Sequence, residues 1–324
     1  MSHLTVSQRY KIETMHQLGH SQKDIAICIE KHKSVVSREL KRNCDQRNQT
    51  YKADLAERKY KQRLITKPKF IRFTQGIKQY VNEYIAQDYS PEQIVGVAKK
   101  QDIICVSHER IYQHLWQDKK QGGILYKRLR TKGKRYRKRG ALKDRRGSIP
   151  GRIDISQRPS IVEEKTRLGD LEVDTVIGAN HKGALVTIND RCTGMVKIRK
   201  VKSKEASVVK EAIIEALQEW KPLLKTITSD NGKEFTFHES ISQCLNIDFY
   251  FAKPYHSWER GANENLNGLI RQYFPKKSSF ENITHQEVQR VEEILNNRPR
   301  KRFNFETPLN KFNKLISVCP FSRD

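Results

Sequence analysis

Residues 171–201 read LEVDTVIGANHKGALVTINDRCTGMVKIRKV, and this stretch decides the fold of the second half of the chain. Runs of apolar and β-branched residues are separated by short polar segments that contain glycine. That pattern predicts three consecutive strands, over Leu171–Gly178, Ala184–Asn189 and Met195–Val201. An α/β domain therefore begins close to residue 165.

The elements that follow complete the pattern of this domain. Apolar residues at helical spacing predict a helix over Ser203–Trp220. The later elements are expected, in order, as a strand at Thr226–Ser229, a short helix around Glu239–Cys244, a strand at Ile247–Ala252, and helices over Ala262–Phe274 and His285–Asn297. This is the element order of the ribonuclease-H-like fold with a mixed five-stranded sheet, and we expect that fold over residues 165–324.

The first 60 residues carry the pattern of a helix-turn-helix unit. A first helix ends at Gly19, and Ser21 begins a second helix with a capping-box pattern. Ser34 is expected to cap a third helix, which would enter the major groove of DNA with its first residues. We therefore expect base contacts from Ser34, Val35, Ser37 and Arg38, and phosphate contacts from Lys41 and Arg42. The alternative is a three-helix bundle that does not touch DNA.

Residues 61–125 repeat this pattern less specifically. Ser90 and Pro91 predict the start of a helix. After an extended piece over Ile103–Val106, Ser107 is expected to cap a helix that carries His108 and Arg110. Both residues are candidate DNA contacts in a second helix-turn-helix, and a solvated helix face explains them nearly as well.

The formal net charge of +26 is divided unevenly along the chain. Residues 1–160 hold 37 Lys and Arg against 15 Asp and Glu, whereas residues 161–324 hold 26 against 22. Such an excess indicates a polyanionic partner, and the alternative is a basic surface that only aids solubility. The densest run lies in an expected linker over residues 126–164. There we expect DNA contacts from Lys134, Arg135, Arg137, Lys138 and Arg139.

Acidic residues at a strand end and on a helix face suggest a metal site. Two-metal phosphoryl transfer needs carboxylate oxygens that hold two ions roughly 4 Å apart. Asp230 directly follows the expected strand Thr226–Ser229. Glu264 lies on the polar face of an expected helix, and 33 residues separate it from Asp230. Asp170, Glu172 and Asp174 all fall on one face of the first strand. Strand alternation alone therefore does not choose a third ligand.

From Leu171 to Asn297 the chain resembles the insertion sequence thirty family of bacterial DDE transposases. LEVDTVIG at 171–178 is similar to the family's block around its first catalytic Asp, which it matches at Asp174. SDNGKEF at 229–235 and PYHSWERGANENLNGLIRQYFPK at 254–276 resemble the blocks of the second and third acids. SRELKRN at 37–43, LNNRPRK at 295–301 and TPL at 307–309 fit as well, so the resemblance covers most of the chain.

Two residues depart from the first block of the family. Leu171 stands where the family has Trp, and Val173 stands where it has Gly. Val173 directly precedes Asp174, so we expect a bulkier side chain to tighten the strand near the metal site. Full activity is therefore not assured by the resemblance.

The resemblance implies a transposase that cuts and joins DNA strands. Asp174, Asp230 and Glu264 would hold two Mg²⁺ ions in each active site, with Mn²⁺ as a substitute. The N-terminal helices would bind the terminal inverted repeats, target DNA would be the second partner, and the protein would act as a homo-oligomer on DNA.

The block around Glu264 adds further candidates. Arg260 and Arg271 are expected at phosphates of the scissile strand. Trp258 either stacks on DNA bases or packs on its own domain, and Glu234 and Glu259 are interpreted as surface or supporting residues.

Composition narrows the remaining classes. No apolar run approaches the ~20 residues needed to span a bilayer, and the N-terminus lacks the apolar stretch of a secretory signal. The six scattered cysteines argue against a disulfide framework or a zinc finger. We expect a protein of the bacterial cytoplasm, at the nucleoid when bound to DNA. Two alternatives stay open: a DNA-binding regulator with a decayed, inactive catalytic domain, and a ribonuclease-H-type RNA nuclease.

Overall fold

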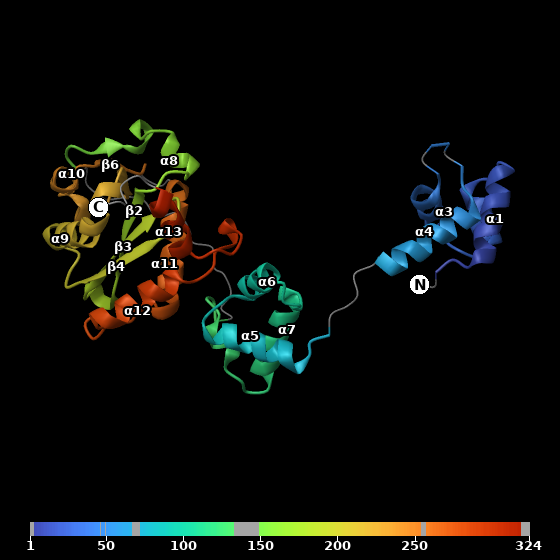
Figure 1. Ribbon diagram of the computed structural model, residues 1–324, viewed down its shortest axis with the longest axis horizontal. Coiled ribbons are helices and arrows are strands. Elements are labelled where there is room, and N and C mark those ends of the chain that lie inside the picture. The colour runs from blue at the N-terminus through green and yellow to red at the C-terminus, as the bar shows by residue number, and fades with distance from the viewer. Residues whose placement is uncertain are drawn as a thin grey trace. The chain divides into compact units, whose positions relative to one another are not determined.

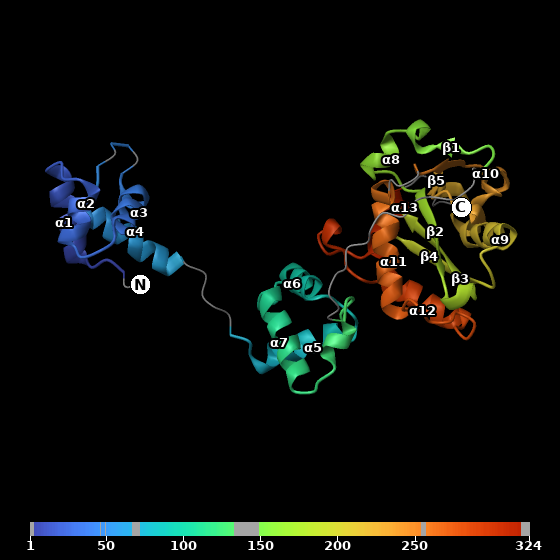
Figure 2. The ribbon, with the colours of Figure 1, turned by 180° about the vertical axis from the view of Figure 1, so that it is seen from behind.

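The computed structural model describes residues 3–45, 47–48, 50–66, 72–132, 149–253 and 257–318. The chain divides into two compact units, Met1–Ile71 and Arg72–Asp324. Figures 1 and 2 show the elements from opposite sides. In the part of the chain that is described, no helix is long and apolar enough to cross a membrane.

The first unit is a bundle of four helices, α1 (Val6–Gln17), α2 (Gln22–Cys28), α3 (Lys33–Asn43) and α4 (Ala53–Thr66). Ser21 caps α2, as predicted. His32 rather than Ser34 caps α3, because the His32 ring accepts a hydrogen bond from the Ser34 N–H at 3.2 Å. The helix α4 was not predicted. Its Glu57 and Glu39 of α3 both pair with Arg9, which is 3% exposed and so ties α1, α3 and α4 together.

The second unit opens with α5 (Gln75–Ala86), α6 (Pro91–Lys100), α7 (His108–Lys120) and the short η1 (Leu125–Arg128). Ser90 caps α6 with a capping box and Ser107 caps α7, and both caps confirm the prediction. The expected extended piece at Ile103–Val106 forms no strand, and α5 was not predicted. Val81, Ile94, Ile111 and Leu115 form the core of this helical part.

The rest of the unit is built on a six-stranded sheet in the order β1-β6-β5-β2-β3-β4. The antiparallel meander of β2 (Asp170–Ile177), β3 (Ala184–Asp190) and β4 (Val196–Val201) confirms the three predicted strands. β5 (Thr226–Ser229) and β6 (Asp248–Phe251) run parallel to β2 and also confirm the prediction. With the helices described below, this mixed sheet has the topology expected for the ribonuclease-H-like fold.

A sixth strand extends the predicted five. β1 (Ile153–Asp154) pairs in parallel with β6, and Ile149 is buried in the core of the sheet domain. Residues 149–164 were assigned to the linker, but in the structure they fold onto the sheet. The basic residues Lys134, Arg135, Arg137, Lys138 and Arg139 lie outside the described residues.

Helices cover both faces of the sheet (Figure 1). α9 (Ala206–Leu217) and α10 (His238–Leu245) pack on one face, and α11 (Gly261–Tyr273) and α12 (His285–Asn296) pack on the other. The last helix is α13 (Pro308–Val318). Shorter pieces are η2 (Ile155–Gln157), α8 (Ile161–Glu164), η3 (Ala179–His181), η4 (Gln218–Leu223), η5 (Lys233–Phe235), η6 (Ser257–Arg260) and η7 (Lys301–Phe303).

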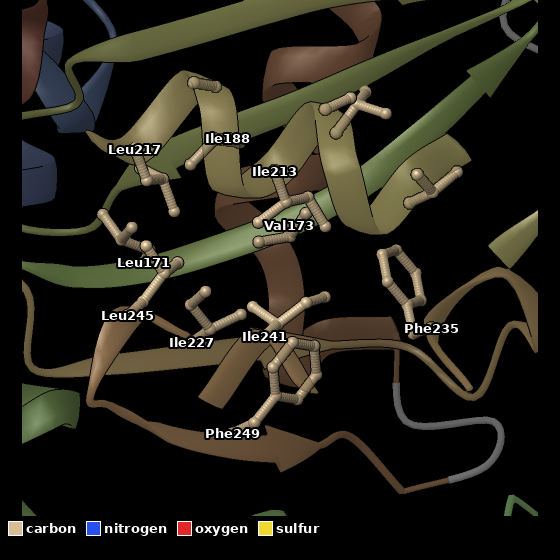
Figure 3. Close-up of a cluster of buried hydrophobic side chains, with 14 of the residues drawn as sticks. Leu171, Val173, Ile188, Ile213, Leu217, Ile227, Phe235, Ile241, Leu245 and Phe249 are labelled. Carbon is tan, nitrogen blue, oxygen red and sulfur yellow. The ribbon is translucent and has the colours of Figure 1, made fainter. Parts of the chain in front are cut away.

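Alternation along β2 decides which residues face which layer. Leu171 and Val173 point into the core beneath α9 and α10, where Figure 3 shows them among Ile213, Ile227 and other apolar side chains. Val176 belongs to the opposite core, beneath α11 and α12. Because side chains alternate, Asp170, Glu172 and Asp174 share the face of Val176 and lie toward α11. Val173 therefore points away from Asp174 and packs in the core beneath α9.

The helical part docks on the sheet domain through α6 and the segment after α12. The Gln93 side-chain amide of α6 donates to the Pro299 carbonyl at 2.6 Å. The buried Arg298 donates to Gln93 and to Gln272 of α11, and Gln272 donates to the Arg128 carbonyl at 2.7 Å. Gly96 lies beneath the Phe305 ring, where any Cβ atom would collide with it. The face of α6 that makes these contacts is therefore covered.

Candidate active site

The register of β2 and β5 brings Asp174 level with Asp230. These parallel strands align Asp170 with Thr226 and Glu172 with Thr228. Continued for two residues along both strands, this register places Asp174 level with Asp230, which directly follows β5. Asp170 lies four residues back along β2, or about 13 Å at the usual rise of a strand. Of the three acids on this face of β2, Asp174 is therefore the one beside Asp230.

Arg260, at the end of η6, lies between these two carboxylates. Its Nη2 atom is 2.7 Å from Oδ2 of Asp174, and its Nη1 atom is 3.6 Å from Oδ2 of Asp230. The Arg260 side chain is only 9% exposed, and its Nε and Nη1 atoms have no hydrogen-bond partner in the described part of the chain. One buried cation thus serves both acids without satisfying all of its own donors.

Backbone and amide groups hold the two carboxylates in place. Asn267 of α11 donates to Oδ2 of Asp174 at 2.8 Å, and the Thr175 N–H donates to its Oδ1 atom at 2.8 Å. The Gly232 N–H donates to Oδ1 of Asp230 at 2.9 Å. Both carboxylates therefore point their oxygens into a fixed, polar surrounding.

Asp174 is more deeply buried than Asp230, and this burial affects its pKa. Desolvation raises the pKa of Asp174, the Arg260 guanidinium opposes that rise, and the Asp230 carboxylate adds to it. The side chain of Asp174 is 17% exposed, against 36% for Asp230. A cation that bound here would relieve the repulsion between two ionised carboxylates.

The other two acids of β2 already have partners. Asp170 accepts two hydrogen bonds from Arg167 and one from Thr226. Glu172 pairs with the buried Arg191 at 2.8 Å and accepts from the Asn263 N–H at 3.1 Å. Both acids are 1% exposed, so they are internal structural groups.

Glu264 stands apart from the two aspartates. It lies in the first turn of α11, and its side chain is exposed. It is three residues before Asn267, so the two side chains are neighbours on the helix surface. The Asn267 amide in turn contacts Asp174. The structure thus brings Asp174 and Asp230 together and leaves Glu264 at the rim of their site.

The donor set of this site fits a divalent metal only in part. Asp174 and Asp230 supply hard oxygen atoms, the ligand type that Mg²⁺ prefers, and they already share one cation in the Arg260 guanidinium. Among the described residues, no three acidic, histidine or cysteine side chains are gathered closely enough to hold a metal ion. A third ligand from Glu264 would require its side chain to turn inward.

The residues of α3 that were predicted to contact DNA are mostly exposed to solvent. Ser34, Ser37, Arg38, Lys41 and Arg42 are exposed on this helix. The guanidinium of Arg38 folds back onto Ser34, with its Nε atom 2.9 Å from the Ser34 carbonyl oxygen. Val35 differs, because it packs partly against the core of the first unit.

The remaining predicted contacts are more varied. His108 and Arg110 lie in the first turn of α7, where Arg110 stacks on the Phe73 ring at 5.6 Å. Arg271 donates to the Ile177 carbonyl at 2.8 Å, at the end of β2, and burial lowers its pKa. The Trp258 side chain lies outside what the structure describes.

Sequence reasoning missed the groups that support the acids. Neither Asn267 nor Thr175 was singled out from the sequence. Glu234, interpreted as a surface or supporting residue, accepts from the Thr175 hydroxyl at 2.8 Å. A usable signal existed for Asn267, because residues three apart on a helix are neighbours and Glu264 was already a candidate.

Comparison with known proteins sets this geometry in a family. A helix-turn-helix domain model matches residues 1–43. The chain is 52% identical, over 97% of each sequence, to the transposase for insertion sequence element IS4351 of Bacteroides fragilis. It is 33% identical to the transposase InsI for insertion sequence element IS30A of Escherichia coli K12, over 95% of this chain and 82% of the relative.

This chain belongs to the family of insertion-sequence transposases. The transposase for IS1086 of Cupriavidus metallidurans is a further relative, at 30% identity over 97% of this chain and 95% of the relative. The family membership spans the helix-turn-helix unit and the sheet domain alike. It therefore applies to the whole length in which Asp174, Asp230 and Glu264 occur.

Proposed function

We propose that this protein is a DNA transposase that binds the terminal inverted repeats of its insertion sequence and then cuts and joins DNA strands. The observation that carries this proposal is the pairing of Asp174 and Asp230 across β2 and β5, around one shared cation, in a chain of the transposase family. Two carboxylates held beside each other on neighbouring central strands are the arrangement that metal-dependent phosphoryl transfer uses.

Asp174, Asp230 and Glu264 are the proposed metal ligands. When bound, two Mg²⁺ ions, or Mn²⁺ in their place, supply activation of a water molecule and stabilisation of the departing 3′ oxygen. Asn267 and the Thr175 and Gly232 N–H groups orient the two aspartates. Glu264, at the exposed start of α11, completes the set by turning toward them.

The proposed reaction has two in-line steps without a covalent enzyme intermediate. In the first, the oxygen of water attacks a phosphodiester phosphorus at the element end, and the bond to the 3′ oxygen breaks, which leaves a 3′-OH and a 5′-phosphate. In the second, that 3′-OH attacks a phosphodiester of the target, whose own 3′ oxygen departs. The number of phosphodiester bonds is unchanged in the second step.

The DNA-binding roles follow the exposure of the helices. We propose that α3 reads the inverted repeats through Ser34, Ser37 and Arg38, while Lys41 and Arg42 contact phosphates. The side of α7 that carries His108 and Arg110 is the second proposed contact, since α6 is engaged with the sheet domain. Joining two ends of one element calls for at least two chains, so we propose a homo-oligomer on DNA.

Incubation with DNA that carries the element's own ends tests this proposal. We expect the full-length protein and Mg²⁺ to produce nicks with 3′-OH ends at the element boundary, mapped by primer extension, and EDTA to abolish them. Binding to the ends without any nick in Mg²⁺ or Mn²⁺ would identify a regulator instead. Cleavage of an RNA–DNA hybrid but not of the element ends would identify a ribonuclease.

A further inference from the structure

A polar pocket lies on the flank of α11 away from the paired aspartates. Its volume is about 670 Å³, within the range of small-ligand pockets. Ala262, Asn265 and Leu269 of α11 line it, whereas Asn267, which contacts Asp174, does not. Its other walls come from β2, β3 and the segment that includes Arg300, Lys301 and Arg302.

Five basic residues and three acidic ones line this pocket. Three acids line it, and two of them, Glu163 and Glu172, pair with Arg191. The third, Glu259, accepts from the Lys253 N–H. The wall also carries Lys165, Arg300, Lys301 and Arg302, of which Lys301 pairs with Glu92 at 3.6 Å. An anion that entered the pocket would therefore meet a surplus of positive charge.

Arg300 and Arg302 line the pocket, and Arg298 lies close to them in the chain. Arg298, Arg300 and Arg302 make no ion pair within the described residues; Arg298 donates to two glutamine oxygens and Arg300 to the Leu295 carbonyl. Burial lowers the pKa of Arg300, and Arg298 and Arg302 lower it further. Crowded cations of this kind cost free energy unless an anion balances them.

A buried donor of one pocket residue also lacks a partner. Arg191 is 2% exposed, and its Nη1 and Nη2 atoms pair with Glu172 and Glu163. Its Nε atom has no hydrogen-bond partner in the described part of the chain. Arg191 is one of the residues that line the pocket. Buried donors are normally satisfied, so the unmet donor points to a missing acceptor.

We propose that this pocket binds a backbone phosphate of DNA, at a site separate from the one where strands are cut. The proposal rests on the proposed function in taking DNA as the partner. Glu172 of the pocket wall lies two residues before Asp174 on the same face of β2, which is about 7 Å along a strand. A DNA strand that lies across α11 therefore reaches Asp174 and Asp230 on one flank of the helix and the pocket on the other.

Binding of a DNA duplex to full-length variants tests the pocket, with Ca²⁺ in place of Mg²⁺ so that no strand is cut. Arg302→Gln and Lys165→Gln remove pocket charges, and Lys204→Gln removes another exposed charge that does not line the pocket. We expect each pocket variant to weaken DNA binding about tenfold. The slope of log K against log salt should become shallower by the amount that corresponds to the loss of about one phosphate contact. Lys204→Gln should behave as the parent chain. Two pocket variants are used so that a folding defect in one, seen by circular dichroism, leaves the other to decide.

A titration with inorganic phosphate distinguishes a DNA-binding pocket from a pocket for a small free anion. If phosphate raises the melting temperature of the parent chain but not of Arg302→Gln, while both bind DNA equally, the pocket serves a small anion and the proposal is overturned. Equal DNA binding by all variants, with no phosphate effect, also overturns it. Phosphate contacts do not depend on base sequence, so weakened binding to a random duplex supports the pocket even if the chain never cuts element ends.

Discussion

The Nη2 atom of Arg260 lies 2.7 Å from Oδ2 of Asp174, in a site where the same guanidinium is 3.6 Å from Asp230. This arginine is the last residue of η6, directly before α11. It occupies the position of a counter-ion between two acids that would otherwise repel each other. Metal binding at these acids must therefore compete with Arg260.

Arg260→Gln should tighten the binding of Mn²⁺ to the full-length protein without DNA by about tenfold. A hydrogen bond to a charged group contributes about 1.5–3 kcal/mol, and about 1.4 kcal/mol corresponds to a factor of ten. Isothermal titration calorimetry measures the affinity. Arg290→Gln, at an exposed position of α12, is the matched control. Unchanged or weaker Mn²⁺ binding by Arg260→Gln would show that the guanidinium does not compete with the metal.

Arg38→Ala should relax the preference for the element's inverted repeats. A base contact contributes roughly 1–3 kcal/mol of discrimination, so we expect specific binding to fall by a factor of about 10–100 with little change for a random duplex. Electrophoretic mobility shifts at fixed salt measure both. Lys11→Gln, exposed on α1, serves as control. An unaltered ratio of specific to random binding would remove Arg38 from the reading surface.

Val173→Gly restores the residue that the family block carries and should destabilise the sheet domain. Val173 is fully buried beneath α9 (Figure 3), and glycine also loosens a strand. Loss of the side chain should cost about 3 kcal/mol of unfolding free energy. Urea unfolding measures this cost, with Val173→Ala as the intermediate step. A change below about 1 kcal/mol would mean that α9 closes over the vacancy without loss.

Local pattern was enough to predict five of the six strands and the caps of α2, α6 and α7. The alternation in LEVDTVIG predicted β2, and Ser90 and Ser107 were recognised as caps because a cap is set by neighbouring residues. The same alternation placed Asp170, Glu172 and Asp174 on one face but could not separate them. Their separation depends on the register between β2 and β5, and residues 56 positions apart set that register.

Other features depend on contacts that no short window contains. β1 has two residues and exists because it pairs with β6, about 100 positions later, so Ile153 and Asp154 looked like linker. Arg260 looked like a surface cation for DNA, and only the packing of α11 on β2 buries it between the acids. The separation of Glu264 from the two aspartates was likewise not foreseen, since spacing fixes the face of a helix but not its distance from a strand.

Asp230→Asn tests the central claim most directly. The change removes one charge and keeps the shape of the side chain, so the fold and the binding of α3 to the element ends should persist. We expect strand cleavage in Mg²⁺ to fall below detection while end binding stays within about twofold of the parent chain; a change of that size is under about 0.5 kcal/mol. Glu211→Gln, an exposed acid on α9, should cleave normally. Cleavage by Asp230→Asn at the parental rate would contradict the assignment of these acids.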